Sequence, residues 1–210
     1  DFSTGSVGLG VAVTSFASIV QDYIQAKSWG ANQKMGRMIA LVGDAELDEG
    51  NIYEALQEGW KNDLRNCWWI IDYNRQSLDG VVREGLFKRV EQIFDAFGWD
   101  VVRAKYGHLQ RAAFEESGGG KLRQWIDDCP NQLYSALTFM GGAVWRERLM
   151  DALGDQGDVT ALIERRSDAE LAELMENLGG NCVQTMADTF DSIDHDRPVC
   201  FLAYTIKGWG

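Results

Sequence analysis

Residues 38–74 read MIALVGDAELDEGNIYEALQEGWKNDLRNCWWIIDYN and carry the pattern that decides the fold. Met38 to Val42 is a short continuous apolar run that ends at Gly43, which is typical of a strand buried on both faces of a parallel sheet. Residues 51–61 have helical spacing, and Trp68 to Ile71 is a second buried-strand candidate. Strand, helix and strand within about 36 residues predict a βαβ unit.

The same alternation continues on both sides of this unit. Upstream, small and apolar residues recur at helical spacing over residues 7–27, and glycines crowd the start of this segment. Downstream, the pattern predicts a helix over 86–97, strands over 99–106 and 199–206, and a mostly helical, polar region over 108–195. The sequence therefore predicts one doubly wound α/β domain over residues 1–210, with a mainly parallel sheet and helices on both faces.

The amino-acid composition makes nucleic acid and membrane surfaces poor binding partners. The chain has 20 Lys and Arg against 32 Asp and Glu, a formal net charge of −12, which repels nucleic acid and anionic lipid surfaces. The apolar runs fall far short of the ~20 residues of a membrane-spanning helix. Its four cysteines are scattered without a CxxC pair, which favours neither a zinc site nor a disulfide framework and indicates a reducing cytoplasm.

Polar side chains follow the two strands of the βαβ unit. Asp44 comes directly after the first strand, and Asn74 follows the second. Because a right-handed crossover makes these strands neighbours about 4.8 Å apart, the carboxylate and the amide oxygen could reach one ion. Such hard oxygen ligands suit Mg²⁺ or Ca²⁺, and Mg²⁺ held by few protein ligands leaves positions for phosphate oxygens. The sequence therefore predicts a phosphorylated ligand.

Backbone N–H groups are the expected phosphate donors. They come from the turn after Asp44 and from the glycine loop at Ser6 to Gly8, which opens the first helix. Donors of this kind would let an acidic protein hold a diphosphate.

The residues of the predicted metal and phosphate sites also have simpler interpretations. Asp44 could cap the following helix, and the loop Gly5 to Gly10 superficially suggests a dinucleotide site, although no strand precedes it and Val13 stands in the third-glycine position. An EF-hand in DAELDEG fails because its sixth position would be a glutamate. The two histidines, His108 and His195, show no matched partners in the sequence.

Five stretches carry a resemblance to a known family. They are DFSTGSVGLG, GDAELDEGN, IIDYNRQSLDGVVR, IFDAFGWDVV and TIKGWG. The spacing from Gly43-Asp44 to Asn74 is similar to the thiamine diphosphate motif, written GDG followed by about thirty residues and Asn. Together the stretches resemble the cofactor-diphosphate domain of the homodimeric pyruvate dehydrogenase decarboxylating component. Transketolase is the nearest related family.

The resemblance implies roles for particular residues. Asp44, Asn74 and the main-chain carbonyl of Gln76 would be the Mg²⁺ ligands, and Glu49 and Glu54 would belong to a proton network between two active sites. Lys207 would lie close to the mouth of the active site. The positions implied to approach the cofactor are Ser6, Val7, Gly8, Gly43, Ala45, Glu46 and Asn74.

The resemblance also implies an activity and partners. It implies decarboxylation of a 2-oxo acid, most simply pyruvate, with acyl transfer to a lipoyl group on an acyltransferase protein. The alternatives are transketolase-type ketol transfer between sugar phosphates, or a non-catalytic cofactor-binding subunit for assembly. The glutamate that activates the aminopyrimidine belongs, in the family, to a second, pyrimidine-binding domain or subunit. We therefore expect a fragment of a longer chain, in a homodimer, that is catalytically incomplete alone.

The sequence departs from the family pattern at two positions. Ala45 replaces the third residue of GDG, which requires a turn with negative φ at this position. Asp72 stands where the pyruvate enzymes tend to have an asparagine, which leaves the Asn74 ligand intact.

Overall fold

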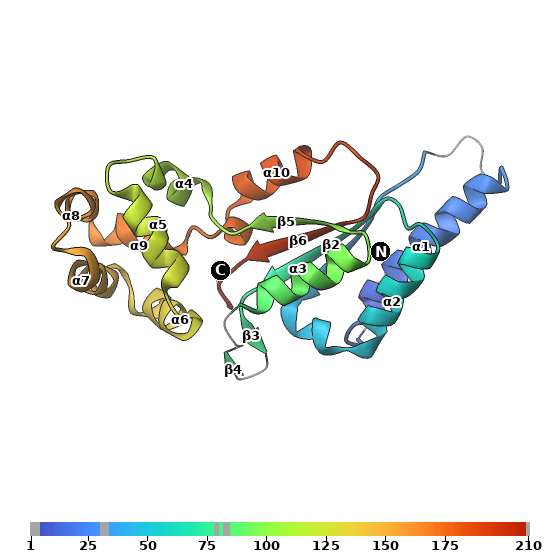
Figure 1. The fold of residues 1–210 in the computed structure, drawn as a ribbon, viewed down its shortest axis with the longest axis horizontal. Helices are drawn as coiled ribbons and strands as arrows, with labels where there is room; N and C mark the ends of the chain where they lie inside the picture. Colours follow the sequence, from blue (N-terminus) through green and yellow to red (C-terminus); the bar gives the residue numbers. More distant parts are fainter. Residues whose placement is uncertain (1–4, 30–33, 78–79, 82–84, 209–210) are drawn as a thin grey trace. The chain divides into compact units, whose positions relative to one another are not determined.

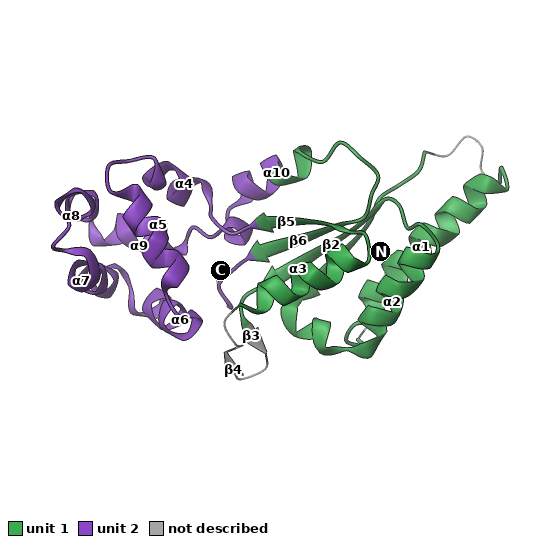
Figure 2. Ribbon diagram, in the orientation of Figure 1, with its two compact units in different colours: residues 1–103, 189–203 green, residues 104–188, 204–210 purple. Residues whose placement is uncertain are grey.

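The computed structural model describes residues 5–29, 34–77, 80–81 and 85–208. These residues form two compact units (Figure 2). Unit 1 comprises residues 1–103 and 189–203, and unit 2 comprises residues 104–188 and 204–210. The assignment of residues 1–210 to one cofactor-binding domain stays a prediction.

A four-stranded sheet organises unit 1. Its order is β1 (Met38–Gly43), β2 (Cys67–Tyr73), β6 (Val199–Tyr204) and β5 (Asp100–Ala104). β1 and β2 are parallel, with Met38 opposite Cys67 and Gly43 opposite Asp72. The arrows of β5 and β6 in Figure 1 also point the same way. The predicted α/β fold with a mainly parallel sheet is confirmed.

Helices and short turns connect the strands of unit 1. They are α1 (Leu9–Ala26), the 3₁₀ turn η1 (Asp44–Asp48), α2 (Gly50–Lys61) and α3 (Leu86–Ala96). A small antiparallel hairpin, β3 (Gln76–Ser77) and β4 (Gly80–Val81), follows β2. The predicted helices over 7–27, 51–61 and 86–97 agree with these bounds to within two residues.

The two faces of the sheet have separate cores because side chains alternate along a strand. Cys67, Trp69 and Ile71 of β2 pack in the cluster that includes α1, α2 and α3. Trp68 packs on the opposite face with Phe201 and Phe190. Helices thus cover both faces of the central strands, as the doubly wound prediction requires.

β1 differs from the prediction of a strand buried on both faces. Ala40 and Val42 are buried toward α1, but the side chains of Ile39 and Leu41 are 50% and 78% exposed. β1 is an edge strand of the described sheet, and no described helix covers its second face. The continuous apolar run was therefore right about strand formation and wrong, within the described residues, about burial.

Unit 2 is mainly helical. Its own core forms around Trp145, which is fully buried and contacts the rings of Tyr134 and Trp125. The Tyr134 hydroxyl donates to the carbonyl of Met175 at 2.6 Å. The elements of this region are α4 (His108–Phe114), α5 (Gly119–Asp128), α6 (Asn131–Met140), α7 (Gly142–Leu153), α8 (Gly157–Glu164), α9 (Asp168–Glu176), η2 (Gly179–Asn181) and α10 (Val183–Asp191), whose last three residues belong to unit 1.

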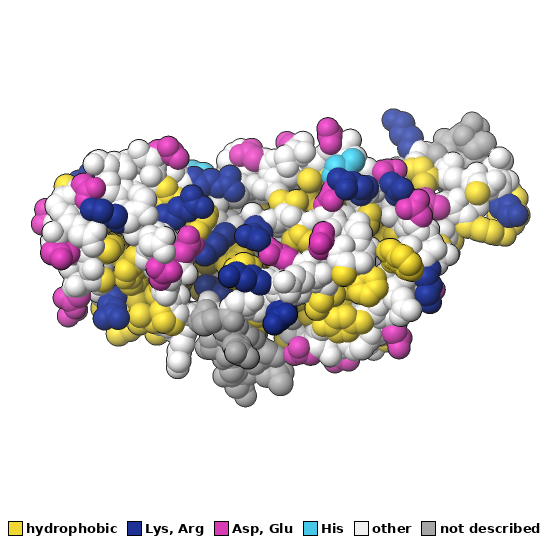
Figure 3. Space-filling model, in the orientation of Figure 1, with side chains coloured by type: hydrophobic (Ala, Val, Ile, Leu, Met, Phe, Trp, Pro, Cys, Tyr) yellow, Lys and Arg dark blue, Asp and Glu magenta, His cyan; other side chains and the backbone are white. Residues whose placement is uncertain are grey.

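Acidic and basic side chains are mixed over the visible face of each unit in Figure 3, although acidic residues are in excess over the whole sequence. Among the helices of the described residues, none combines the length and the apolar character that crossing a membrane requires.

Candidate functional site

The candidate site lies where β1 and β2 end. Gly43 and Asp72 are partners in the parallel ladder, so the segments that follow them leave the same edge of the sheet. In open parallel sheets this edge is where ligands bind. Asp44 opens η1 after the first of these strands, and Asn74 follows the second.

Asp44 connects the two strand ends. Its side chain is only 5% exposed, and its Oδ2 accepts a hydrogen bond of 2.7 Å from the backbone N–H of Arg75. Arg75 adopts φ 67°, a left-handed conformation that non-glycine residues adopt rarely. The buried carboxylate is thereby held against the turn that contains Asn74.

The other two predicted metal ligands belong to the same turn. The Asn74 side-chain nitrogen donates to Oδ2 of Asp72 at 3.4 Å. Gln76, predicted to act through its main-chain carbonyl, begins β3, and the backbone of β3 lies close to that of η1. The structure therefore gathers the three predicted positions around one bend of the chain, two of them side chains with oxygen atoms and the third a backbone carbonyl.

Glu46 joins the glycine loop to the end of β1. Its Oε2 accepts a hydrogen bond from the N–H of Gly8 at 2.9 Å, and its Oε1 accepts one from the N–H of Gly43 at 3.1 Å. Ser6 and Val7, which precede Gly8, are exposed. Ala45 lies inside η1, whose helical backbone an alanine adopts without strain, so its replacement of the family glycine is compatible with the turn.

The predicted catalytic residues are all exposed. Glu49 lies directly before α2 and Glu54 lies within its first two turns. Lys207 follows β6 and belongs to unit 2. Their proposed roles rest on the family resemblance.

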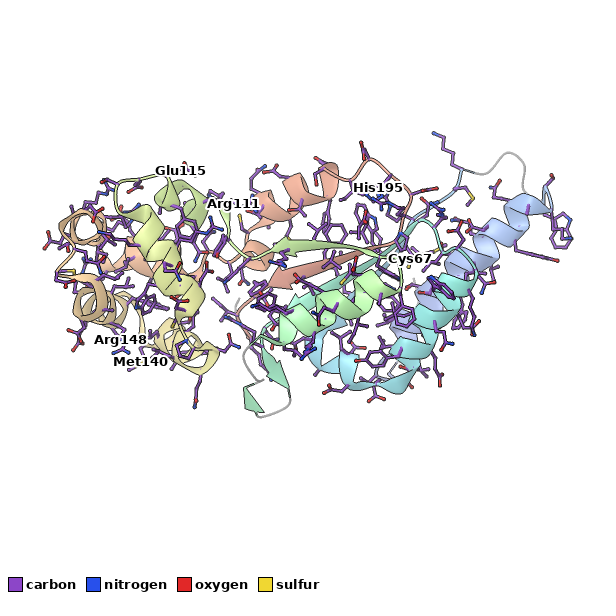
Figure 4. The ribbon with its side chains drawn as sticks, in the orientation of Figure 1. Cys67, Arg111, Glu115, Met140, Arg148 and His195 are labelled. Atoms are coloured by element: carbon purple, nitrogen blue, oxygen red, sulfur yellow. The ribbon has the colours of Figure 1, made fainter. Side chains whose placement is uncertain are left out.

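Both histidines have partners that the sequence did not reveal. In unit 2, Nδ1 of His108 lies 3.0 Å from Sγ of Cys182, and in unit 1, Nε2 of His195 lies 2.9 Å from Oδ2 of Asp100. His195 occupies the loop before β6 (Figure 4). The first pair is separated by 74 residues along the chain, so only the fold brings it together.

The residues at the strand ends fit a divalent cation and a phosphate group. A nearly buried carboxylate, with an amide side chain and a backbone carbonyl on the turn that donates a hydrogen bond to it, is the type of ligand set that Mg²⁺ accepts. The N–H groups of Gly8 and Gly43 already converge on an anion, the carboxylate of Glu46. Among the described residues, no group of three or more His, Cys, Asp and Glu side chains could hold a metal ion. The proposed ligand set is of a different kind, because only one of its three ligands, Asp44, is a side chain of these types.

Comparisons with known proteins agree with the resemblance. The sequence model of the family described as "Transketolase, thiamine diphosphate binding domain" matches residues 1–116. Over the whole chain, the pyruvate dehydrogenase E1 component of Buchnera aphidicola subsp. Schizaphis graminum is 28% identical. Those of Corynebacterium glutamicum and Escherichia coli K12 are each 26% identical over the whole chain. The chain spans 23% of the length of these relatives.

Proposed function

Because this chain belongs to the family of transketolase thiamine diphosphate-binding domains, we propose that it holds the diphosphate of that cofactor in an enzyme that decarboxylates a 2-oxo acid. The relatives that match the entire chain are named pyruvate dehydrogenase E1 components, which supports pyruvate as the substrate. Acyl transfer to a lipoyl group on a partner protein completes the proposed reaction. The bound cofactor supplies the carbanion chemistry.

The chain's own residues would bind and orient the cofactor. Asp44, Asn74 and the carbonyl of Gln76 would hold Mg²⁺, which neutralises diphosphate charge in an otherwise acidic protein. The hydrogen bond from Arg75 keeps the Asp44 carboxylate fixed before the metal arrives. This hydrogen bond is the observation that carries the proposal, since it links the two strand ends that the metal would bridge.

The loop before α1 and the turn after β1 would receive the diphosphate. Gly8, Gly43 and Ala45 offer backbone N–H groups, and Glu46 lies between the first two. Ser6 and Val7 continue this loop, and the exposed side chain of Val7 would lie near the aminopyrimidine. Glu49 and Glu54 would contribute to proton transfer between two active sites, and Lys207 would lie at the mouth of the site.

Further parts of the enzyme would complete the site. We propose that residues 1–210 act as one cofactor-binding domain, and that a second, pyrimidine-binding domain or subunit supplies the activating glutamate. The proposed assembly is a homodimer in the cytoplasm, where a lipoyl acyltransferase is the acyl acceptor. The chain's 23% share of the relatives' length is consistent with these additional parts.

Removal of the Asp44 carboxylate tests the metal site. In the full-length protein, Asp44→Ala should weaken Mg²⁺-dependent thiamine diphosphate binding by more than the roughly 10- to 100-fold that loss of an outer-shell partner costs. Isothermal titration calorimetry measures the dissociation constant. Asp48→Ala is the matched control, because Asp48 is an exposed carboxylate at the other end of η1. Equal affinities for Asp44→Ala and the unaltered protein would reject the site.

A turnover assay separates the alternative activities. The full-length protein should reduce an artificial electron acceptor with pyruvate. Activity with sugar phosphates and none with pyruvate would instead establish ketol transfer. Cofactor binding without either activity would establish an assembly role.

A further inference from the structure

The carboxylate of Glu46 lies against two backbone N–H donors from distant parts of the chain. Its two carboxylate oxygens accept separate hydrogen bonds, at 2.9 Å from the N–H of Gly8 and at 3.1 Å from the N–H of Gly43. Gly8 lies 38 residues before Glu46. One side chain therefore connects the start of α1 to the end of β1.

These donors are of the kind that a phosphate uses. Gly8 is the N-cap residue of α1 and Gly43 is the N-cap residue of η1, so both N–H groups lie at the positive ends of helical segments. A carboxylate there satisfies the donors in the same way as a phosphate oxygen would. Glu46 thus occupies two donors of the proposed diphosphate site with an anion belonging to the chain itself.

The glycine loop has a tightly defined closed position. Gly8 is buried and has φ 78°, and a Cβ added to it would collide with Oδ1 of Asn51 and lie 3.1 Å from Cβ of Glu49. Oδ1 of Asn51 is itself buried and accepts no hydrogen bond from the described residues. The two hydrogen bonds of Glu46 are therefore well placed to hold the loop against η1 and α2.

We infer that Glu46 is a positioning residue that keeps the glycine loop closed on the end of β1, and that its carboxylate leaves these donors when the diphosphate binds. This inference rests on the proposed function. The internal carboxylate competes with the ligand, so the apparent affinity is the intrinsic affinity multiplied by the fraction of molecules in which Glu46 has moved away. The Glu46 carboxylate would consequently leave the two N–H groups and return to them with occupancy of the site.

Glu46→Gln keeps the shape of the side chain but removes its charge, so the diphosphate should compete better for the two N–H groups. Hydrogen bonds to a carboxylate are roughly twice as strong as those to a neutral amide, so Glu46→Gln loosens the closed loop. It also removes repulsion between the side chain and the incoming anion. We expect Glu46→Gln to bind inorganic diphosphate, in excess Mg²⁺, about 3- to 30-fold more tightly than the unaltered protein.

The experiment is calorimetric titration of the full-length protein with inorganic diphosphate and, separately, with thiamine diphosphate. Glu58→Gln is the matched control: Glu58 is a partly exposed glutamate of α2 paired with Lys61, and its replacement removes the same charge without touching the loop. Tighter binding by Glu46→Gln alone supports the inference. Unchanged or weaker binding overturns it and leaves the proposed function standing if the unaltered protein binds thiamine diphosphate. Failure of the unaltered protein to bind thiamine diphosphate overturns both.

A second variant tests the inference even if Glu46→Gln does not fold. Glu46→Asp keeps the charge on a side chain that is one methylene shorter, which retracts the carboxylate from the two N–H groups, so it should also bind inorganic diphosphate more tightly than the unaltered protein. Unchanged or weaker binding by Glu46→Asp would overturn the inference.

Discussion

At the scale of single residues, Gly8 has a conformation that few other residues can replace. Its φ of 78° and its close approach to Asn51 both disfavour a side chain. Gly8→Ala should therefore destabilise the protein by about 1–3 kcal/mol, measured by urea denaturation. Gly5→Ala is the matched control, since a Cβ at Gly5 meets no atom within 4 Å. Similar midpoints for both variants would show that the loop accommodates a side chain at Gly8.

Cys182 has an unusual environment in unit 2. Burial would raise the pKa of its thiol, but hydrogen bonds from His108 and Thr185 outweigh this effect and lower the pKa from 9.0 to about 6. The Thr185 hydroxyl lies 3.1 Å from Sγ, and the Thr185 N–H donates to Sγ at 3.4 Å. By contrast, burial raises the pKa of Cys67 to about 11.

The titration of the thiol measures this difference. Because Cys182 is buried, a probe that needs no access to the sulfur is required, and NMR of ¹³C-labelled cysteine should show a titration midpoint for Cys182 near pH 6. His108→Ala removes the imidazole but keeps the backbone N–H, so it should raise the midpoint of Cys182, whereas His195→Ala should leave it in place. A midpoint above 8 in the unaltered protein would contradict the assigned environment.

The same shift links folding stability to pH. The folded-state pKa of Cys182 lies below the ordinary value of 9.0, so the folded protein binds fewer protons than the unfolded chain between these values. This contribution to stability is complete above about pH 9 and is lost as the pH falls through about 6.

Some of these site residues could be predicted from the sequence, but the contacts that depend on tertiary packing could not. The positions of Asp44 and Asn74 follow from local strand ends, which a periodic pattern locates well. A glutamate three residues after Gly43 is also compatible with a capping box, although that signature usually begins with Ser or Thr. The bonds of Glu46 to Gly8 and of His108 to Cys182 depend on tertiary packing, and no local pattern encodes them.

At the scale of elements, β2 contributes a large, fully buried side chain to the core of unit 1. Trp69 is fully buried, its ring centroid lies 4.7 Å from that of Trp99, and its Nε1 donates to Oγ1 of Thr14 at 3.1 Å. Trp69→Ala should lower the free energy of unfolding by roughly 3–5 kcal/mol, measured by denaturant titration. Trp60→Ala, at a side chain that is 63% exposed, should change it by less than about 0.5 kcal/mol. Equal effects would contradict the described core.

The type of each element could be predicted, but the surroundings of an element could not. Apolar runs located β1, β2 and β6 because hydrophobic side chains and strand geometry go together. They did not distinguish β6, buried at all six positions, from β1, whose outer face exposes Leu41. Position within the sheet decides this difference, and an apolar run of five or six residues does not indicate whether its strand is central or at an edge.

At the scale of the whole molecule, the helical region interrupts the sheet in sequence. The backbone N–H of Gly107 donates to the carbonyl of Asn177 at 2.8 Å, and Tyr106 forms a bridge with Leu178. The chain therefore returns to nearly the point at which it left. We expect deletion of residues 108–176, joined by an Asn-Gly turn, to leave a sheet that unfolds cooperatively, because the connection needs only a short turn.

Circular dichroism during thermal unfolding of the deletion variant in the full-length protein would test this. Deletion of residues 199–204 is the contrasting variant, since it removes β6 from between β2 and β5. It should abolish the cooperative transition of the sheet. Loss of the transition in both variants would show that the helical region is required for the sheet to form.

The position of β6 has a consequence for synthesis on the ribosome. Its neighbours β2 and β5 are complete by Ala104, whereas β6 begins at Val199. At roughly 5–20 residues per second, the growing polypeptide waits about 5–20 s before the strand between them is translated. During that interval the facing backbone groups of β2 and β5 have no partner from β6, while the helices encoded between them can already form local contacts. Newly made molecules are therefore most vulnerable to misassociation just before translation of β6 ends.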